Sequence, residues 1–144
     1  MEAPVEDNIR SILSMYKSRT TKDEANAPER EVAHETPTLS EIPDVFFDEV
    51  LPQFKLSRSE ISVLMLLYRQ VWCRANLYRS HGIGPLNAYH DLARLLNMSQ
   101  DEVIHAIRTL EGHGFIQTIR AGQYFVRKFF TEQNDTKYGQ HYEF

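Results

Sequence analysis

The middle of the chain alternates runs of apolar residues at helical spacing with short polar breaks. Residues 42–52, IPDVFFDEVLP, predict a short helix that Pro52 ends or bends. Residues 59–76 place their large apolar side chains on one broad stripe, which is typical of a core helix. The stripe consists of Ile61, Leu64, Met65, Tyr68, Val71 and Trp72. We therefore expect the second of these helices to form the centre of the core.

Two shorter helices follow, separated by only a few residues. Asn87 can cap a helix over residues 88–96, and a further helix over residues 100–113 ends at a glycine C-cap, Gly114. The residues expected to face the core are Leu92, Ala93, Leu95 and Leu96 in the first helix, and Val103, Ile107 and Leu110 in the second. A break this short between two helices predicts the turn of a helix-turn-helix.

After Gly114 the pattern changes from helical to β. Residues 115–120 and 123–130 are rich in β-branched and aromatic side chains, and they flank the dipeptide Ala121–Gly122. Glycine in a two-residue connection favours a β-hairpin. Helix, helix, short turn, helix and hairpin is the order of a winged helix-turn-helix. The predicted fold is therefore mainly α with a small β-hairpin, a winged helix-turn-helix domain that covers residues 38–130.

The motif Ser/Thr-x-x-Glu occurs three times near the predicted helix starts. The pairs are Thr38 with Glu41, Ser57 with Glu60, and Ser99 with Glu102. In each pair the hydroxyl can accept a hydrogen bond from a free backbone amide, while the Glu side chain reaches back to the cap. We therefore expect a helix to begin at each of the three pairs.

The two ends of the chain lack the apolar content of a core. A short amphipathic helix predicted over residues 5–17 carries on one side Ile9, Ile12, Leu13 and Tyr16. Residues 18–37 hold almost no large apolar side chain, so residues 1–37 are predicted to be a flexible segment. Its amphipathic helix is a candidate for docking on a protein partner. Residues 131–144 are predicted to form a polar, loosely held tail.

Composition and charge limit the cellular compartments and the classes of partner that suit this chain. The 144 residues carry a formal net charge of −4, but acids predominate over residues 1–40 and basic residues over residues 79–128. That distribution permits nucleic-acid binding without requiring it. The single cysteine excludes an intrachain disulfide, the apolar run 63–68 is too short for a membrane span, and the acidic N-terminus does not resemble a signal peptide. We expect a cytoplasmic protein with no membrane partner.

The exposed face predicted for helix 100–113 is the main candidate for DNA recognition. It carries Asp101, His105, Arg108, Thr109 and Gly112, with Ser99 and Gln100 at its leading end. The leading end of a helix favours a phosphate through its free amides and its dipole. Arg108 suits a guanine edge or a phosphate, and Gln100 has the donor–acceptor pair suited to adenine.

Further candidate contacts lie outside that helix. Arg120, Gln123 and Arg127 flank the predicted hairpin tip, where a wing can lie along the DNA backbone or the minor groove. Phosphate contacts are expected from Arg94, Arg120, Arg127 and Lys128. The full predicted DNA-binding set is Arg94, Ser99, Gln100, His105, Arg108, Thr109, Arg120, Gln123, Arg127 and Lys128.

Residues 42–116 resemble a known family. The segments IPDVFFDEVL, LSRSEISVLMLLYRQVW and LNAYHDLARLLNMSQDEVIHAIRTLEGHGFI look like the N-terminal DNA-binding domain of phage replication initiators of the replication protein O type. They are also similar to winged-helix domains of plasmid initiators and MarR-like regulators. The resemblance implies origin or operator recognition, with residues 99–109 in the groove. The chain departs from those initiators because only about fourteen residues follow the hairpin and because helix 100–113 is less basic.

Two functional hypotheses remain open. The first is a sequence-specific double-stranded DNA-binding protein that acts in transcription regulation or replication initiation, with a homodimer expected if its sites are palindromic. The alternative is a winged-helix protein-interaction adaptor that does not bind DNA, favoured by the acidic pI and by the tethered amphipathic segment over residues 9–16. No residue set favours an enzyme, a cofactor or a metal, because the six histidines lack a ligand cluster and Cys73 lacks a catalytic base.

Overall fold

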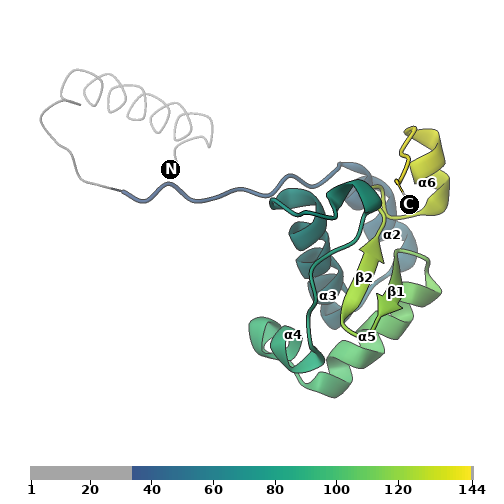
Figure 1. Cartoon of the computed structure of the whole chain (residues 1–144). Coiled ribbons are helices and arrows are strands. Elements are labelled where there is room, and N and C mark those ends of the chain that lie inside the picture. Colours follow the sequence, from purple (N-terminus) through teal and green to yellow (C-terminus); the bar gives the residue numbers. More distant parts are fainter. Residues whose placement is uncertain (1–33, 144) are drawn as a thin grey trace, which may run out of the picture. The chain divides into compact units, whose positions relative to one another are not determined.

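The structure, a computed structural model, describes residues 34–143, and its compact unit begins at Leu39. This unit combines helices with a two-stranded antiparallel sheet (Figure 1). Its elements in chain order are η2 (Phe46–Val50), α2 (Leu51–Phe54), α3 (Arg58–Tyr68), η3 (Arg69–Cys73), η4 (Arg79–His81), α4 (Tyr89–Leu96), α5 (Gln100–Gly112), β1 (Ile116–Arg120), β2 (Gln123–Val126) and α6 (Glu132–Lys137). The prediction of a mainly helical fold with a small hairpin is confirmed. The helix predicted over residues 5–17 lies outside the described residues.

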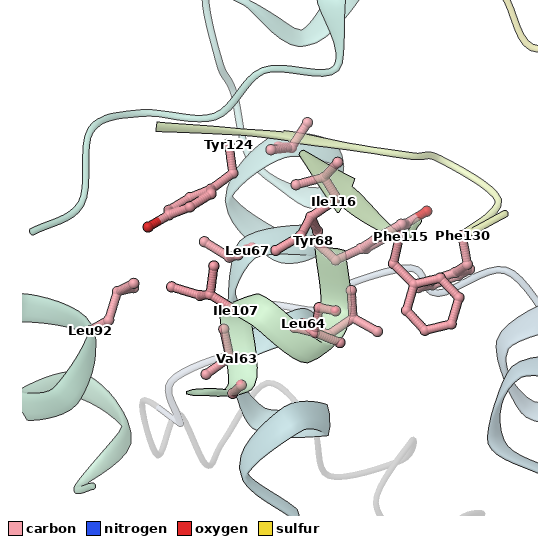
Figure 2. Packing of buried hydrophobic residues seen from close by; sticks show 14 of the residues in the cluster. Val63, Leu64, Leu67, Tyr68, Leu92, Ile107, Phe115, Ile116, Tyr124 and Phe130 are labelled. Carbon is pink, nitrogen blue, oxygen red and sulfur yellow. The ribbon is translucent and has the colours of Figure 1, made fainter. Parts of the chain in front are cut away.

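The central helix is α3, which the π-helical turn η3 continues. The capping box predicted at Ser57 fixes its start: the Ser57 hydroxyl accepts from the Glu60 amide at 3.2 Å, and the Glu60 carboxylate accepts from the Ser57 amide at 3.1 Å. The buried residues of α3 and η3 are Val63, Leu64, Leu67, Tyr68, Val71 and Trp72, several of which Figure 2 labels. Ile61 and Met65 are only half-buried, so the real stripe is rotated slightly from the predicted one.

The short helix predicted before α3 is present as η2 and α2. Phe46 and Val50 are buried, and Pro52 lies at the start of α2, directly after the π-helical turn η2. The helix start predicted at Thr38 is wrong, because residues 34–43 contain neither helix nor strand. Pro43 explains this difference, since a proline disfavours helical backbone at the residue before it.

The helices α4 and α5 are separated by a tight turn, as predicted. Asn97 takes the left-handed conformation with φ 52°, and Ser99 caps α5 by accepting a hydrogen bond from the Glu102 amide at 3.1 Å. The core residues predicted for α5 are confirmed as buried. The prediction for α4 was wrong at Leu95, which is 62% exposed, because only Leu92 and Ala93 of this short helix are buried.

Asn87 does not cap α4, contrary to the prediction. The N-cap position is Ala88, which offers no side-chain hydrogen bond. The Asn87 side chain is buried instead and pairs in both directions with Gln70, donating at 2.8 Å and accepting at 3.2 Å. Asn87 therefore ties the chain before α4 to the central helix.

The predicted hairpin is present, with Ala121 and Gly122 as the connection between β1 and β2. The register pairs Ile116 with Val126 and Arg120 with Gln123, with an irregularity between Thr118 and Arg120. Gly122 has φ 83°, and a Cβ atom added there would lie 2.7 Å from the Asn87 carbonyl oxygen. A residue other than glycine would therefore disturb the contact between the hairpin tip and the chain before α4.

A third extended segment lies against β2. Ile83 forms an isolated antiparallel bridge with Phe125. The Gly84 amide donates to the Tyr124 carbonyl at 3.0 Å, and the Val126 amide donates to the Gly82 carbonyl at 2.7 Å. The loop between η4 and α4 thus adds a short β pairing to the hairpin.

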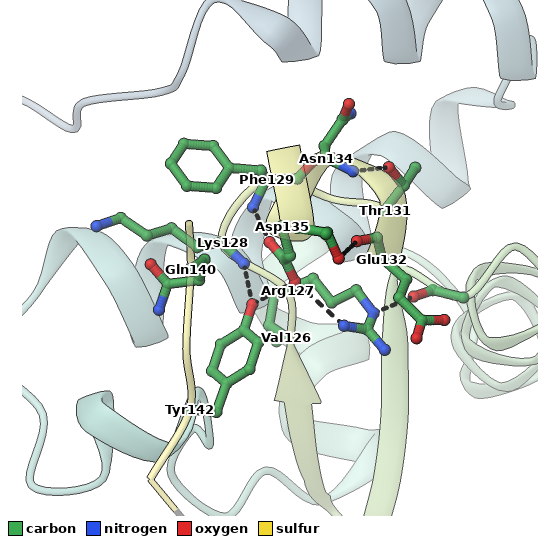
Figure 3. A network of polar contacts seen from close by, with 12 residues as sticks. Val126, Arg127, Lys128, Phe129, Thr131, Glu132, Asn134, Asp135, Gln140 and Tyr142 are labelled. Carbon is green, nitrogen blue, oxygen red and sulfur yellow. Dashed lines mark hydrogen bonds and ion pairs between the residues drawn. The ribbon is translucent and has the colours of Figure 1, made fainter. Parts of the chain in front are cut away.

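Residues 131–143 differ from the predicted loose tail, because they form α6 and pack on the domain (Figure 3). Asp135 is only 3% exposed, and its carboxylate accepts from Arg127 Nη1 at 3.1 Å, the Phe129 amide at 3.1 Å and the Tyr142 hydroxyl at 2.6 Å. The Tyr142 hydroxyl in turn accepts from the Lys128 amide at 3.0 Å. A buried carboxylate with this many partners orders the segment after β2.

Within the described part of the chain, no helix combines the length and the apolar character that crossing a membrane requires.

Truncating the core should destabilise the domain strongly. Leu64→Ala and Ile107→Ala each should lower the free energy of unfolding by about 2–5 kcal/mol, because each leaves a cavity between α3 and α5. Urea denaturation followed by circular dichroism measures the effect. Leu95→Ala is the matched control and should cost well under about 1 kcal/mol, since Leu95 is largely exposed. Equal losses at Leu64 and Leu95 would contradict this packing.

Neutralising the buried carboxylate should also destabilise the domain. Asp135→Asn should cost about 3 kcal/mol, because it removes the negative charge that pairs with the Arg127 guanidinium and replaces one carboxylate oxygen by a donor. Oδ1 accepts from the Phe129 amide and Oδ2 from Arg127 and the Tyr142 hydroxyl, so an amide cannot satisfy all three donors. Glu132→Gln, on the exposed side of α6, is the control and should be nearly neutral. Urea denaturation measures the free energy of unfolding of both variants. If both equal the wild type in this free energy, residues 131–143 are not held by this network.

The stability of the domain at alkaline pH should depend on Tyr124. Its hydroxyl is buried beside Tyr89 but has no hydrogen-bond partner in the described residues, and burial, followed by the proximity of Tyr89, raises its pKa above the usual value. The unfolded chain then ionises first, so the stability contributed by the neutral phenol falls as pH rises above about 10. Tyr124→Phe should match or exceed wild-type stability at pH 8 and should retain about 1 kcal/mol more at pH 11.

Urea denaturation at both pH values measures this difference. Tyr138→Phe, at a half-exposed ring, is the control and should lose stability with pH as the wild type does. The same alkaline loss in Tyr124→Phe and wild type would show that the Tyr124 phenol ionises freely in the folded protein.

Candidate nucleic-acid interface

The solvent-facing side of α5 carries the residues predicted for it. Gln100, Asp101, His105 and Arg108 are exposed, and the rise of a helix places Gln100 and Arg108 roughly 12 Å apart. Thr109 is half-buried, and its hydroxyl donates to the His105 carbonyl at 3.1 Å. Gln100, His105 and Arg108 are therefore free to reach a ligand, whereas the Thr109 hydroxyl is already engaged by its own helix.

The leading end of α5 is held by a side-chain cap. The Ser99 hydroxyl accepts from the Glu102 amide, and the Glu102 carboxylate accepts from the Ser59 hydroxyl on α3 at 3.3 Å. The predicted pair is thus used partly for capping and partly for contact with α3. Ser99 remains exposed, and its hydroxyl proton is available to a phosphate oxygen.

The hairpin tip presents one exposed cation. Arg120 is exposed, and its Nε donates to the Gln123 side-chain oxygen at 3.0 Å. Gln123 was predicted as a DNA contact, but it is only 8% exposed and donates to the Gly84 carbonyl at 3.0 Å. Gln123 therefore positions Arg120 from within the protein rather than meeting a ligand.

Arg127 and Lys128 lie at the other end of β2, roughly 13 Å of strand from the tip. Arg127 pairs with Asp135, donates from Nε to the Gly114 carbonyl at 3.2 Å, and covers the Phe125 ring at 5.3 Å. Lys128 lies 5.6 Å from the centre of the Trp72 ring. The prediction that Arg127 flanks the tip is therefore wrong, and these two cations do not join the candidate face.

Arg94 provides a further exposed cation, on α4. Its guanidinium lies 3.1 Å from the Asp91 carboxylate, and its side chain is 79% exposed. His90 Nε2 lies 3.3 Å from the same carboxylate. Exposed ion pairs of this kind contribute little free energy, so Arg94 can exchange Asp91 for another anion at small cost.

A notch of about 430 Å³ lies where the starts of α4 and α5 meet the hairpin tip. Its lining comprises Leu86, Asn87, Ala88, Tyr89, His90, Gln100, Ala121 and Gly122. The lining is mostly apolar, and the open first turn of α4 adjoins it because Ala88 provides no cap. No local sequence pattern predicts this notch, since it depends on the tertiary contact between Asn87 and Gly122.

The interface thus combines three exposed cations, Arg94, Arg108 and Arg120, with two carboxylates, Asp91 and Asp101. The notch connects Gln100 at the start of α5 to the hairpin tip, so one ligand can contact both. Across residues 34–143, no group of three or more His, Cys, Asp or Glu side chains is arranged to hold a metal ion. The chemistry of the face is hydrogen bonding and modest positive charge.

Comparisons of the chain with models of protein families, with curated protein sequences and with solved structures returned no match.

Proposed function

We propose that residues 39–130 form a winged helix-turn-helix that binds double-stranded DNA in a sequence-specific manner, in transcription regulation or replication initiation. The fold assignment is supported by the order α3, paired segment at Ile83, α4, α5 and hairpin. The observation that carries the functional proposal is the shared notch, which joins the start of the exposed α5 face to the hairpin tip. A helix and an adjacent wing on one face fit a major groove and its neighbouring backbone.

In this proposal α5 reads the base edges. Arg108 donates two hydrogen bonds to a guanine, and Gln100 pairs with an adenine about one-third of a helical turn of DNA away. His105 lies between them on the exposed side of α5 and contacts a base or a phosphate. Asp101 repels phosphates, which keeps non-specific binding weak and increases the share of recognition that depends on bases.

Arg120 and Arg94 position the protein on the backbone. Both are exposed, and neither lies on α5, so in this proposal they contact phosphates of the DNA backbone rather than base edges. The exposed Ser99 hydroxyl and the free amides at the start of α5 add a neutral phosphate contact. With so few cations one copy binds weakly, and a homodimer on a palindromic site would gain affinity from a second face.

A protein-interaction adaptor is the second candidate function. The notch favours it, because a mostly apolar hollow of about 430 Å³ suits a partner's side chain better than a phosphate. Asp91 and Asp101 on the same face also reduce its attraction for DNA. In that case α5 would contact a protein, and the exposed arginines would contribute to its rim.

Two arginine variants test the DNA proposal. A site is first selected from a random DNA pool at two salt concentrations, and affinity is then measured by fluorescence anisotropy. Arg108→Ala should cost about 1–3 kcal/mol and relax the preference at one base position. Arg120→Ala should weaken binding to all sequences alike and lower the salt slope by about one phosphate contact.

Lys137→Ala is the matched control, because it removes one exposed positive charge on α6, away from the candidate face. It should leave both affinity and base preference unchanged. Equal, salt-sensitive binding of the wild type to the selected duplex and to a scrambled one would rule out sequence-specific recognition. Loss of specificity in Lys137→Ala would show that net charge, rather than the α5 face, governs binding.

A further inference from the structure

A second hollow lies at the base of the hairpin, at the opposite end of β2 from the candidate DNA face. We call it the Trp72 cleft; its volume is about 260 Å³, and Ile42, Pro43, Tyr68 and Trp72 form its apolar part. Arg79 and Lys128 border it with positive charge. The cleft thus combines an apolar surface with two cations that the proposed DNA contacts do not use.

Trp72 holds a fixed position in this cleft. Its indole Nε1 donates to the Val126 carbonyl at 3.0 Å, and its ring is buried except for a small exposed part. Tyr68, one turn earlier, donates its hydroxyl to the Lys128 carbonyl at 2.8 Å. Both rings are therefore oriented before any ligand arrives, which reduces the entropy cost of binding.

The two cations converge on the same ring. The Arg79 guanidinium carbon lies 6.0 Å from the centre of the Trp72 ring, and Lys128 Nζ lies 5.6 Å from it. Neither side chain forms an ion pair within the described residues. Two like charges beside one aromatic ring repel each other, so an anion placed between them would be stabilised by both.

The surroundings favour a single carboxylate over a nucleic-acid backbone. Glu41 borders the cleft together with the two cations. Its carboxylate would repel the successive phosphates of a polyanion, whose charge extends past Arg79 and Lys128. One acidic side chain, by contrast, fits a cleft of this volume and needs only the two cations.

We propose that the Trp72 cleft binds an acidic side chain of a protein partner, with a neighbouring apolar residue of that partner against Trp72 and Ile42. The carboxylate is held by Arg79 and Lys128, and the partner's backbone runs across the exposed rim. This site is independent of the proposed DNA function, because its residues lie at the base of the hairpin and not at its tip. A chain bound to DNA through α5 would keep the cleft accessible.

Trp72 is the only tryptophan in the chain, so its fluorescence reports directly on the cleft. The full-length protein is titrated with a blocked peptide that carries one carboxylate, acetyl-Gly-Glu-Leu-Gly amide. The comparison ligands are its neutral isostere, acetyl-Gly-Gln-Leu-Gly amide, its basic counterpart, acetyl-Gly-Lys-Leu-Gly amide, and a short DNA duplex. The acidic peptide alone should give a saturable change in Trp72 fluorescence that weakens as salt is added.

Paired variants assign the binding to the two cations. Arg79→Gln combined with Lys128→Gln should lower the affinity for the acidic peptide roughly tenfold, since two ion pairs are lost. Arg79→Lys combined with Lys128→Arg should retain binding, which separates loss of charge from loss of fold. Arg69→Gln combined with Lys137→Gln removes the same charge from exposed positions outside the cleft lining and should bind as the wild type does.

Three outcomes would overturn the proposal. One is the absence of any saturable fluorescence change with the acidic peptide at millimolar concentration. Another is an equal response to the neutral or basic peptide, which would show that the carboxylate is not recognised. The third is an equal response to the DNA duplex, which would make the cleft a general anion site. None of these results alters the expectations for Arg108 and Arg120.

Discussion

Tyr68 and Trp72 attach the base of the hairpin to the central helix through two hydrogen bonds made from largely apolar positions. Their rings are buried, yet the hydroxyl of the first and the indole N–H of the second reach the carbonyls of Lys128 and Val126. Tyr68 also stacks on Phe130, with the ring centres 4.9 Å apart and an angle of 11° between the planes. The position of the hairpin relative to α3, and hence to α5, depends on these contacts.

This arrangement connects the two surfaces of the domain. The polar ends of the two rings satisfy backbone groups that the short sheet leaves free, which a purely apolar side chain could not do. At the same place the chain leaves β2 and enters the segment ordered by Asp135. The hairpin is therefore anchored at its base by α3 and by the segment that holds α6.

The elements of the fold were predictable where a local pattern determines them. The boundaries of α5, the capping box at Ser57 and the connection at Gly122 all follow from residues close in sequence. The prediction of a helix start at Thr38 was wrong because Pro43 disfavours helical backbone at the residue before it. The Ser/Thr-x-x-Glu motif takes no account of a proline further along the chain. The burial predicted for Leu95 was wrong because the inward stripe of α4 runs through Tyr89, Leu92, Ala93 and Leu96, and Leu95 lies beside that stripe rather than on it.

The candidate site was harder to predict than the fold. The α5 residues were identified from one helical stripe, but the hairpin candidates divide between the two ends of β2. Gln123 and Arg127 have polar side chains that sequence alone assigns to the surface. The partner of Gln123 is the Gly84 carbonyl, 39 residues away, which no local pattern identifies. Asp135 lies only eight residues from Arg127, but it belongs to a segment that was predicted to be a loose tail. The Trp72 cleft depends on hydrogen bonds between residues 54 and 60 positions apart.

The contact between Gly122 and Asn87 fixes the geometry of the candidate face. The Asn87 amide donates to the Gly122 carbonyl at 2.6 Å, so the tip cannot swing without breaking a bond to the chain that leads into α4. The spacing between the hairpin tip and the chain that enters α4 is therefore set within the domain. A ligand that contacted both elements at once would meet them at this fixed separation.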